Sequence, residues 1–361
     1  MIINKPRNIK SLDRCIYGKG TFDQLDEILS FKRKDNGFVV FLLDDYFNGK
    51  ELENRIPLKN QDILIRISAA DEPTTDLIDE VVVKCKKHSS SLPVAMIGIG
   101  GGSVMDVCKA ASLMVTNPGY SFEYQGLDLI KNPGVYSIVI PTISGTGAEV
   151  SMTAVLTGPV KKLGIKCDFT VPDQVLLDSE LIYSVPKEQR FYTGMDCFIH
   201  GIEAIDGRHI NEFARGFAEK SLDLCREVFL NSKISRELAD EKLMVASYMG
   251  GLSLTYSQVG VCHALSYGLS YVLHTHHGIA NCIVFNVLED YYSDGVKEFH
   301  EMLRINNISL PKNYTKGLSE AEMSKMVETS YALDHMWDHA IGANWKEIIT
   351  KDKIRALFER M

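Results

Sequence analysis

The chain has 361 residues, of which 45% are hydrophobic, and this is more apolar material than one ordinary core holds, so we expect two domains. Its formal net charge of −8 comes from interspersed acidic and basic residues without a Lys/Arg-rich tract, which argues against nucleic acid as a partner. No apolar run approaches the roughly 18 residues of a membrane span, and segment 1–7 lacks the apolar core of a signal peptide. We therefore expect a cytoplasmic protein with neither nucleic acid nor a membrane as partner.

Eight cysteines are spread through the chain without any Cys-x-x-Cys pair. This distribution is typical of reduced thiols that pack as small apolar side chains in a cytosolic protein. Cys197 and Cys262 adjoin residues that we consider below as metal ligands, so either could in principle bind a soft metal. We expect them to be packed thiols instead, because the side chains of adjacent helical residues point in different directions.

The first half of the chain alternates short apolar runs with helical patterns. We expect strands at residues 38–45, 62–67, 93–100 and 136–141, and an amphipathic helix at residues 75–88. Strands separated by helices are typical of βαβ units, so this half should form an α/β domain with a mainly parallel sheet. Ligands of such sheets bind at the carboxyl ends of the strands.

A glycine run stands where the third expected strand ends and a helical pattern begins. It consists of Gly100, Gly101 and Gly102, followed by Ser103 and then by Asp106. Glycines at such a junction let the backbone approach a pyrophosphate, whose charge the helix N-terminus stabilises. The run lacks the Gly-x-Gly-x-x-Gly spacing of ordinary dinucleotide folds, and a tight structural turn is the alternative. We predict a phosphate-binding turn with these residues as cofactor-binding candidates.

Two further segments could contact the same cofactor. Asp44 or Asp45, at the end of the first expected strand, could accept hydrogen bonds from an adenosine ribose and would disfavour a 2′-phosphate, which favours NAD over NADP. The polar loop 141–151 carries Thr142 and Thr146 and could hydrogen-bond phosphate or ribose. The adjacent Lys161 and Lys162 follow it, and one of them could reach the cofactor, although paired lysines are more often simply solvated.

The segment 194–200 contains a pattern suited to a metal ion. If the segment is helical, Asp196 and His200 project from one face with about 5–6 Å between their Cβ atoms. A carboxylate combined with imidazoles suits Zn²⁺ or Fe²⁺, whereas Mg²⁺ and Ca²⁺ prefer oxygen ligands. A capped helix with a buried, hydrogen-bonded histidine would give the same pattern. The pair alone therefore leaves both interpretations open.

Two later histidines, His263 and His277, favour the metal site. In one continuous helix they would lie about 21 Å apart, too far for one ion. The chain must therefore turn back between them, either at Gly268 or at the polar residues 275–276. One aspartate and three histidines would fill most of a coordination sphere and leave one position for a substrate oxygen.

Strand patterns disappear after about residue 186. Helices are expected at residues 211–229 and 240–258, so the second half should be all-α. We predict an NAD-binding α/β domain at residues 1–185 and a helical metal-binding and catalytic domain at residues 186–361.

Four separate motifs resemble those of one known family, the iron-containing (group III) alcohol dehydrogenases. The motifs are Gly-Gly-Gly-Ser-x-x-Asp at 100–106, Pro-Thr-x-x-Gly-Thr-Gly-x-Glu at 141–149, Asp-x-x-x-His at 196–200, and His263 with His277-Gly278-x-x-Asn281. The resemblance implies an NAD(P)-binding α/β domain, a helical domain, and one divalent ion, iron or zinc.

The resemblance also assigns roles to individual residues. It implies that the ion is held by Asp196, His200, His263 and His277. It further implies that Gly100 to Ser103, Thr142 and Lys162 line the dinucleotide. The implied reaction is the NAD-linked oxidation of an alcohol, and a homodimer is compatible with the sequence.

Two positions depart from the usual family pattern. Tyr267 stands where a second histidine is usual, and His276 stands where a proline is usual. Both lie beside proposed ligands, so we take them as candidate catalytic residues and expect a substrate other than a simple short-chain alcohol. Arg208, His209 and His276 are the nearest cations by sequence for an acidic substrate.

Within the family, the sequence is most similar to the branch that acts on an acidic eight-carbon sugar. Members of that branch oxidise the C8 hydroxyl of 3-deoxy-D-manno-octulosonate on the way to its 8-amino derivative in lipopolysaccharide. Three alternatives remain: a dehydrogenase of another small alcohol or polyol, a lyase resembling dehydroquinate synthase, and a non-enzymatic relative that senses nucleotides.

Overall fold

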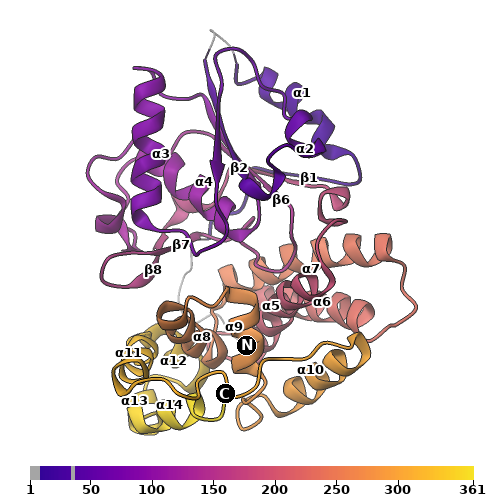
Figure 1. Cartoon of the computed structure of the whole chain (residues 1–361), viewed down its shortest axis with the longest axis vertical. Helices are drawn as coiled ribbons and strands as arrows, with labels where there is room; N and C mark the ends of the chain where they lie inside the picture. The colour runs from indigo at the N-terminus through magenta and orange to yellow at the C-terminus, as the bar shows by residue number, and fades with distance from the viewer. Residues whose placement is uncertain (1–8, 34–36) are drawn as a thin grey trace. The chain divides into compact units, whose positions relative to one another are not determined.

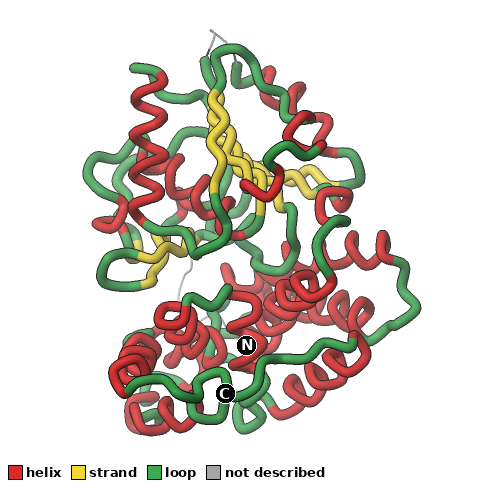
Figure 2. Tube along the Cα trace, in the orientation of Figure 1, coloured by secondary structure: helices red, strands yellow, loops and turns green. Residues whose placement is uncertain are grey.

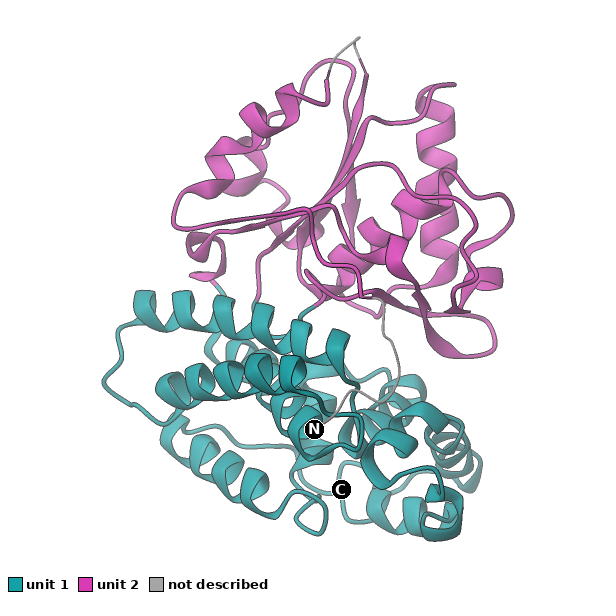
Figure 3. Ribbon diagram, turned by 180° about the vertical axis from the view of Figure 1, so that it is seen from behind, with its two compact units in different colours: residues 1–7, 144–147, 185–361 teal, residues 8–143, 148–184 magenta. Residues whose placement is uncertain are grey.

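A computed structural model describes residues 9–33 and 37–361, so the expectation about segment 1–7 lies outside the described residues. The chain divides into two compact units, coloured separately in Figure 3. One unit comprises residues 9–143 and 148–184 and contains the strands; the other comprises residues 144–147 and 185–361 and is helical (Figure 2). The α/β class of the first and the helical class of the second confirm the expected fold.

The α/β unit is built on a six-stranded sheet in which every neighbouring pair is parallel. In spatial order its strands are β1 (Arg14–Tyr17), β9 (Gln174–Leu177), β6 (Ser137–Pro141), β4 (Ala95–Gly100), β2 (Val39–Asp44) and β3 (Ile63–Ile67). The central strands are buried on both faces, as in parallel sheets covered by helices. Four of the strands coincide with the four apolar runs of the sequence, and β1 and β9 were not predicted.

Helices cover both faces of this sheet (Figure 1). Alternate residues of β2 pack with α1 (Leu25–Ser30) and α2 (Glu51–Asn54) in one apolar core. On the other face, α4 (Gly102–Met114) lies on β4, and Gly98 makes this contact close, because a Cβ there would be 2.6 Å from Cys108 Cβ. Next to α4 lies α3 (Thr75–His88), whose first turn is capped by Thr74.

A small three-stranded sheet completes the α/β unit. It consists of β5 (Gly126–Leu127), β8 (Lys162–Lys166) and β7 (Thr153–Thr157), with β7 and β8 antiparallel. Short 3₁₀ helices connect the larger elements at Thr21–Gln24, Asp45–Phe47, Ser121–Tyr124, Asp168–Thr170 and Ser179–Ile182.

The helical unit surrounds one large apolar core. Its helices are α5 (Lys187–Asp206), α6 (Glu212–Phe229), α7 (Arg236–Tyr256), α8 (Val261–Leu273), α9 (His277–Phe285), α10 (Ser293–Asn306), α11 (Glu320–Tyr331), α12 (Asp334–Ile341), α13 (Trp345–Ile348) and α14 (Lys351–Phe358). The expected helices 211–229 and 240–258 correspond to α6 and α7. Among the described residues, no helix is long and apolar enough to span a membrane.

Candidate metal centre and cofactor loops

Helix α5 carries two of the candidate ligands on one buried face. Asp196 and His200 are four residues apart in the middle of this 20-residue helix, and both side chains are almost completely buried. The helix can lie this deep because Gly194 faces Phe229, where a Cβ would be 2.4 Å from the ring. The helical spacing expected from the sequence is therefore present.

The other two ligands come from a helical hairpin. His263 lies in the first turn of α8, and His277 is the first residue of α9. The chain reverses between them at His274, which adopts a left-handed conformation with φ of 53°. Helix α8 continues straight through Gly268, so of the two expected turning points the polar segment before His277 is the correct one.

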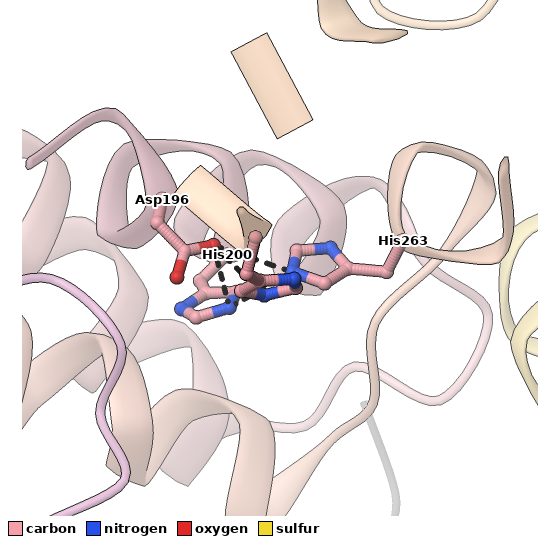
Figure 4. Close-up of side chains that lie close together, drawn as sticks. Asp196, His200 and His263 are labelled. Atoms are coloured by element: carbon pink, nitrogen blue, oxygen red, sulfur yellow. Dashed lines mark hydrogen bonds and ion pairs between the residues drawn. The ribbon is translucent and has the colours of Figure 1, made fainter. Parts of the chain in front are cut away.

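The four side chains converge on one point, and Figure 4 shows three of them, Asp196, His200 and His263. Their ligand atoms all lie within 4.8 Å of one another. Asp196 Oδ1 is 3.2, 3.4 and 3.6 Å from the Nε2 atoms of His200, His263 and His277, and the first two Nε2 atoms are 3.0 Å apart. Ligands at a zinc-type bond length of about 2.1 Å in a tetrahedron lie roughly 3.4 Å from each other. These separations fit side chains that share a single ion.

The electrostatics of the cluster also suit a cation. Burial acts to raise the pKa of Asp196, but the neighbouring histidines hold it well below its usual range, so the carboxylate is ionised. Burial lowers the pKa of His200 to about 4. Burial would lower the pKa of His263 too, but the Glu203 and Asp196 carboxylates raise it to about 9. Lone pairs crowded in this way are stable only with a proton or a metal ion between them, so the residues fit a divalent ion.

Two residues to which the sequence interpretation gave no role contact the candidate ligands. Glu203 Oε2 accepts a hydrogen bond from His263 Nδ1 over 2.5 Å. Asn281 Nδ2 lies 2.7 Å from Asp196 Oδ1 and 3.2 Å from Nε2 of both His263 and His277. The sequence feature that could have identified them is their helical spacing from the candidate ligands: Glu203 follows His200 by three residues, and Asn281 follows His277 by four.

The two residues that depart from the family pattern lie at the more open side of the cluster. His277 has 26% of its side chain exposed, whereas the other ligands are buried. The ring of Tyr267 meets the ring of His277 edge-on, with 5.9 Å between centroids. His276 is exposed and occupies the N-cap position of α9 without a side-chain capping hydrogen bond. Both residues therefore lie beside His277.

The other candidate cations are less well placed. His209 Nε2 is 2.7 Å from Asp338 Oδ2, and its ring stacks on His339. Arg208 is exposed beyond the end of α5. His276 is thus the cation candidate that adjoins a ligand.

In the α/β unit, the glycine run joins β4 to α4. Helix α4 begins at Gly102, and its N-cap Gly101 makes no side-chain cap, so the first turn has backbone N–H groups without an intrahelical partner. A Cβ at Gly100 would be 2.6 Å from Val104 Cβ and 3.1 Å from Asp44 Cβ, so this glycine permits close packing. Ser103 lies in the first turn of α4. The turn therefore has a packing role as well as the geometry of an anion site.

Asp44 and Asp106 stand in different surroundings. Asp44, at the end of β2, accepts a hydrogen bond from Tyr46 N over 3.0 Å, and burial raises the pKa of its carboxyl. Asp106 is buried, pairs with Lys109 Nζ at 3.0 Å and accepts from Val155 N at 2.9 Å. Lys109 in turn donates to the carbonyl oxygens of Ala148 and Thr153. Asp106 thus holds the loop before β7 through Lys109.

The polar loop after β6 is shaped by close packing. Thr142 is buried, and its N–H donates to the carbonyl oxygen of Gly100 over 3.0 Å, which joins this loop to the glycine run. A Cβ at Gly145 would be 1.6 Å from Thr193 O, and one at Gly147 would be 2.4 Å from Gly251 Cα. Thr146, half-buried between these glycines, belongs to the segment 144–147 that groups with the helical unit.

The two lysines after this loop differ in their environment. Lys162 is buried at the start of β8, with Nζ 3.2 Å from Glu72 Oε1. Lys161 is exposed and reaches the carbonyl oxygen of Gln125 over 3.4 Å. Lys162 is thus the more ordered of the two.

Comparison with known proteins identifies the class to which this fold and this cluster belong. Residues 13–179 match the family of iron-containing alcohol dehydrogenases, and residues 190–323 match the C-terminal domain of Fe-containing alcohol dehydrogenases. These matches cover most of the chain, which therefore belongs to the iron-containing alcohol dehydrogenase family.

Individual relatives are enzymes that interconvert alcohols and aldehydes. A sulfoacetaldehyde reductase of Bilophila wadsworthia is 30% identical over 69% of this chain, a match that spans 65% of that protein's length. A 1-propanol dehydrogenase of Salmonella typhimurium is 32% identical, over 78% of this chain and 72% of its own. The solved sulfoacetaldehyde reductase of Bifidobacterium kashiwanohense in complex with NAD⁺ has the same fold, with a TM-score of 0.80, 21% identity and 98% coverage of each chain.

Proposed function

We propose that this protein is a metal-dependent, NAD-linked alcohol dehydrogenase in which Asp196, His200, His263 and His277 hold one divalent ion, iron or zinc. The observation that carries the proposal is the convergence of these four side chains in a member of the iron-containing alcohol dehydrogenase family. Such an ion supplies a Lewis acid that lowers the pKa of an alcohol and so eases hydride loss from its carbon. The reaction converts a primary alcohol and NAD⁺ into an aldehyde, NADH and a proton.

The protein's own groups have separate tasks in this reaction. Residues 1–185 would bind the dinucleotide, and residues 186–361 would hold the metal. The pyrophosphate would contact the backbone N–H groups of the turn formed by Gly100, Gly101, Gly102 and Ser103, because those donors begin helix α4. Asp44 is the acceptor for the adenosine ribose, since its carboxylate ends the strand beside this turn and disfavours a 2′-phosphate.

The remaining cofactor-binding candidates are supported to different degrees. Thr142 is joined to the glycine run by its hydrogen bond to Gly100, and Thr146 and Lys162 complete the set of direct contacts. The bonds of Asp106 to Lys109 and to Val155 N support an indirect role in shaping the cofactor loop. NAD as the cofactor is further supported by the relative whose structure contains NAD⁺.

For the substrate, we propose the C8 hydroxymethyl group of 3-deoxy-D-manno-octulosonate, or a closely similar acidic sugar. The supporting observation is the pair of polar residues Tyr267 and His276 beside His277, and the proposal follows the resemblance of the sequence to that branch of the family. A relative named for sulfoacetaldehyde, an anionic aldehyde, is compatible with an acidic substrate. The second candidate is a small neutral alcohol, which the relative named for 1-propanol favours.

Activity measurements separate these candidates. The purified protein, loaded with Zn²⁺ or Fe²⁺, is mixed with NAD⁺ and either the sugar acid or 1-propanol, and NADH absorbance is followed. We expect a higher kcat/KM for the sugar acid, and a higher value for 1-propanol would overturn the substrate proposal. Loss of bound metal and of NADH formation in His263→Ala and His277→Ala, with His300→Ala as a surface control, tests the ligand assignment. Normal metal content in both ligand variants would contradict it.

A further inference from the structure

Glu203 is a fully buried carboxylate outside the proposed ligand set. It follows Asp196 by seven residues and His200 by three, along the same face of α5, and its side chain is completely buried. Isolated buried carboxylates are costly, so such a group needs specific partners. Its partners here lie at the start of α8, where His263 is located.

Both oxygens of this carboxylate accept hydrogen bonds. Oε1 accepts from Cys262 N over 2.6 Å and from the Tyr292 hydroxyl over 3.2 Å. Oε2 accepts from His263 Nδ1 over 2.5 Å. Cys262 N is one of the donors that the first turn of a helix leaves without an intrahelical partner, and Gly260, at the N-cap of α8, provides no side-chain cap. Glu203 therefore caps α8 and holds His263 with the same group.

This arrangement fixes which nitrogen of His263 carries hydrogen. Because a carboxylate only accepts, Nδ1 carries hydrogen whether or not the ring is charged, and when the ring gives up its other proton to bind an ion, the lone pair is on Nε2. Nε2 is the atom that faces Asp196 and His200, at 3.4 and 3.0 Å. His263 is thus held in the one tautomer that can ligate an ion at this place.

We propose that Glu203 is a positioning residue of the metal centre: it holds His263 in the metal-binding tautomer and supplies the second negative charge that balances a divalent ion. Asp196 provides the first charge from within the ligand set. With both carboxylates ionised, the buried cluster is neutral when a divalent ion is bound, whereas without Glu203 it carries an uncompensated positive charge. The inference rests on the proposed metal-dependent function.

The substitution Glu203→Gln tests this with little change in size. A glutamine has one acceptor and one donor end, so it cannot accept from both Cys262 N and His263 Nδ1. A backbone N–H cannot become an acceptor, but an imidazole can by moving its proton. The amide oxygen should therefore take Cys262 N, and the amide nitrogen should face Nδ1, which forces the proton of His263 onto Nε2.

Two measurements report the result. Competition with a chelator gives the affinity for Zn²⁺, which we expect Glu203→Gln to lower about 10–100-fold, as for other residues that orient metal ligands. Nitrogen-15 NMR of histidine-labelled protein, with His263→Ala to assign the signal, shows whether Nδ1 or Nε2 carries the hydrogen. We expect Nδ1–H in the wild type and its loss in the variant.

Tyr292→Phe is the matched control, because it removes another donor to the same carboxylate and leaves His263 Nδ1 bonded. Its Zn²⁺ affinity and its Nδ1–H signal should equal those of the wild type. Unchanged Zn²⁺ affinity and an unchanged His263 tautomer in Glu203→Gln would overturn the inference. A wild-type His263 without hydrogen on Nδ1 would overturn it as well, and this can be observed even if the variant fails to fold. If the wild type bound no metal, the proposed function would fail, and the NMR signals alone would decide the tautomer question.

Discussion

At the residue scale, Tyr267 is the position where this chain differs most informatively from its family. Its ring lies edge-on to His277, the most exposed of the four candidate ligands, so the residue lies on the more open side of the cluster. A phenol has a pKa near 10 and is a poorer proton relay at neutral pH than an imidazole. Orientation of a polyhydroxylated substrate by hydrogen bonding is therefore its expected task.

We predict that Tyr267→Phe binds metal and NAD normally but raises KM for the sugar acid. The loss of one hydrogen bond to a buried partner costs about 1–3 kcal/mol, which corresponds to roughly a 5- to 150-fold increase. Steady-state kinetics with the sugar acid and with 1-propanol check this, since the neutral alcohol should show a much smaller change. Unchanged kcat and KM for both substrates would mean that Tyr267 only packs against the core.

The sequence predicted the ligand cluster but not the residues that support it. Asp196 and His200 were recognisable because helical geometry alone places them together. His263 and His277 were candidates on the condition that the chain turns back between them, but the sequence did not single out His274, where the left-handed backbone lies. Glu203 was overlooked because a glutamate in a helix is usually solvated, and its partners come from distant segments.

At the scale of elements, the prediction was good for long, apolar strands and helices. The strands β2, β4 and β6 were found because they are buried on both faces and read as continuous apolar runs. The strands β1 and β9 have only four residues each, and β5 has two, which is too short for a periodic signal. Gly268 was a misleading turn candidate, because a Cβ there would be 2.3 Å from Ser330 Oγ. Its role is close packing of α8 against α11.

The glycine run at the start of α4 gives a prediction for cofactor binding. At Gly101, an added Cβ would be 3.1 Å from Ile143 Cγ2, so a branched side chain would project into the space beside the exposed N–H groups. We expect Gly101→Val to weaken NAD binding at least about tenfold, or about 1.4 kcal/mol, without loss of bound metal. Fluorescence titration with NADH checks the affinity for the cofactor, and metal analysis checks that the bound metal is retained.

Gly216→Val is the corresponding control in the helical unit, where an added Cβ meets nothing within 4 Å. It should leave NADH titration unchanged. Equal affinities for the wild type and Gly101→Val would show that the turn is only structural, which is the alternative interpretation of this glycine run.

The loop 144–147 gives a second prediction about an element. Gly145 has φ of 143°, and its Cβ position lies 1.6 Å from the carbonyl oxygen of Thr193, three residues before Asp196. We expect Gly145→Ala to destabilise the helical unit by more than the roughly 1–3 kcal/mol that unfavourable backbone conformation costs. Gly317→Ala isolates that cost, since Gly317 also has positive φ but an added Cβ meets nothing within 4 Å. Equal urea midpoints for the two variants would contradict the close contact.

At the scale of the whole molecule, the two units have separate cores, so a single unfolding free energy does not describe the chain. Both tryptophans, Trp337 and Trp345, lie in the helical unit, are buried and stack with 5.9 Å between ring centroids. Tryptophan fluorescence therefore reports the unfolding of that unit alone. This makes the effect of a single buried group in the helical unit measurable.

His339 is such a group, two residues after Trp337. It is fully buried, its Nε2 donates to the carbonyl oxygen of Glu203 over 2.9 Å, and its Nδ1 accepts from His209 N over 3.3 Å. The neutral ring satisfies both bonds, and a protonated ring cannot accept the second. Burial lowers the pKa of His339 to about 4, although the bond to the Glu203 carbonyl opposes this.

This lowered pKa predicts how the stability of the helical unit depends on pH. In the unfolded chain, histidine titrates near pH 6.5. Above that pH the ring is neutral in both states and has no effect; as the pH falls toward 4, only the unfolded state gains the proton, so stability decreases. The free energy of unfolding falls by about 3 kcal/mol in total, and this full decrease is reached below pH 4.

Urea unfolding followed by tryptophan fluorescence between pH 7.5 and about 4.5 measures this free energy. It should show a smaller decrease for His339→Gln than for the wild type, because glutamine has no proton to gain. Parallel pH curves for the two proteins would mean that His339 has the same pKa in the folded unit as in the unfolded chain, contrary to its burial and its hydrogen bonds.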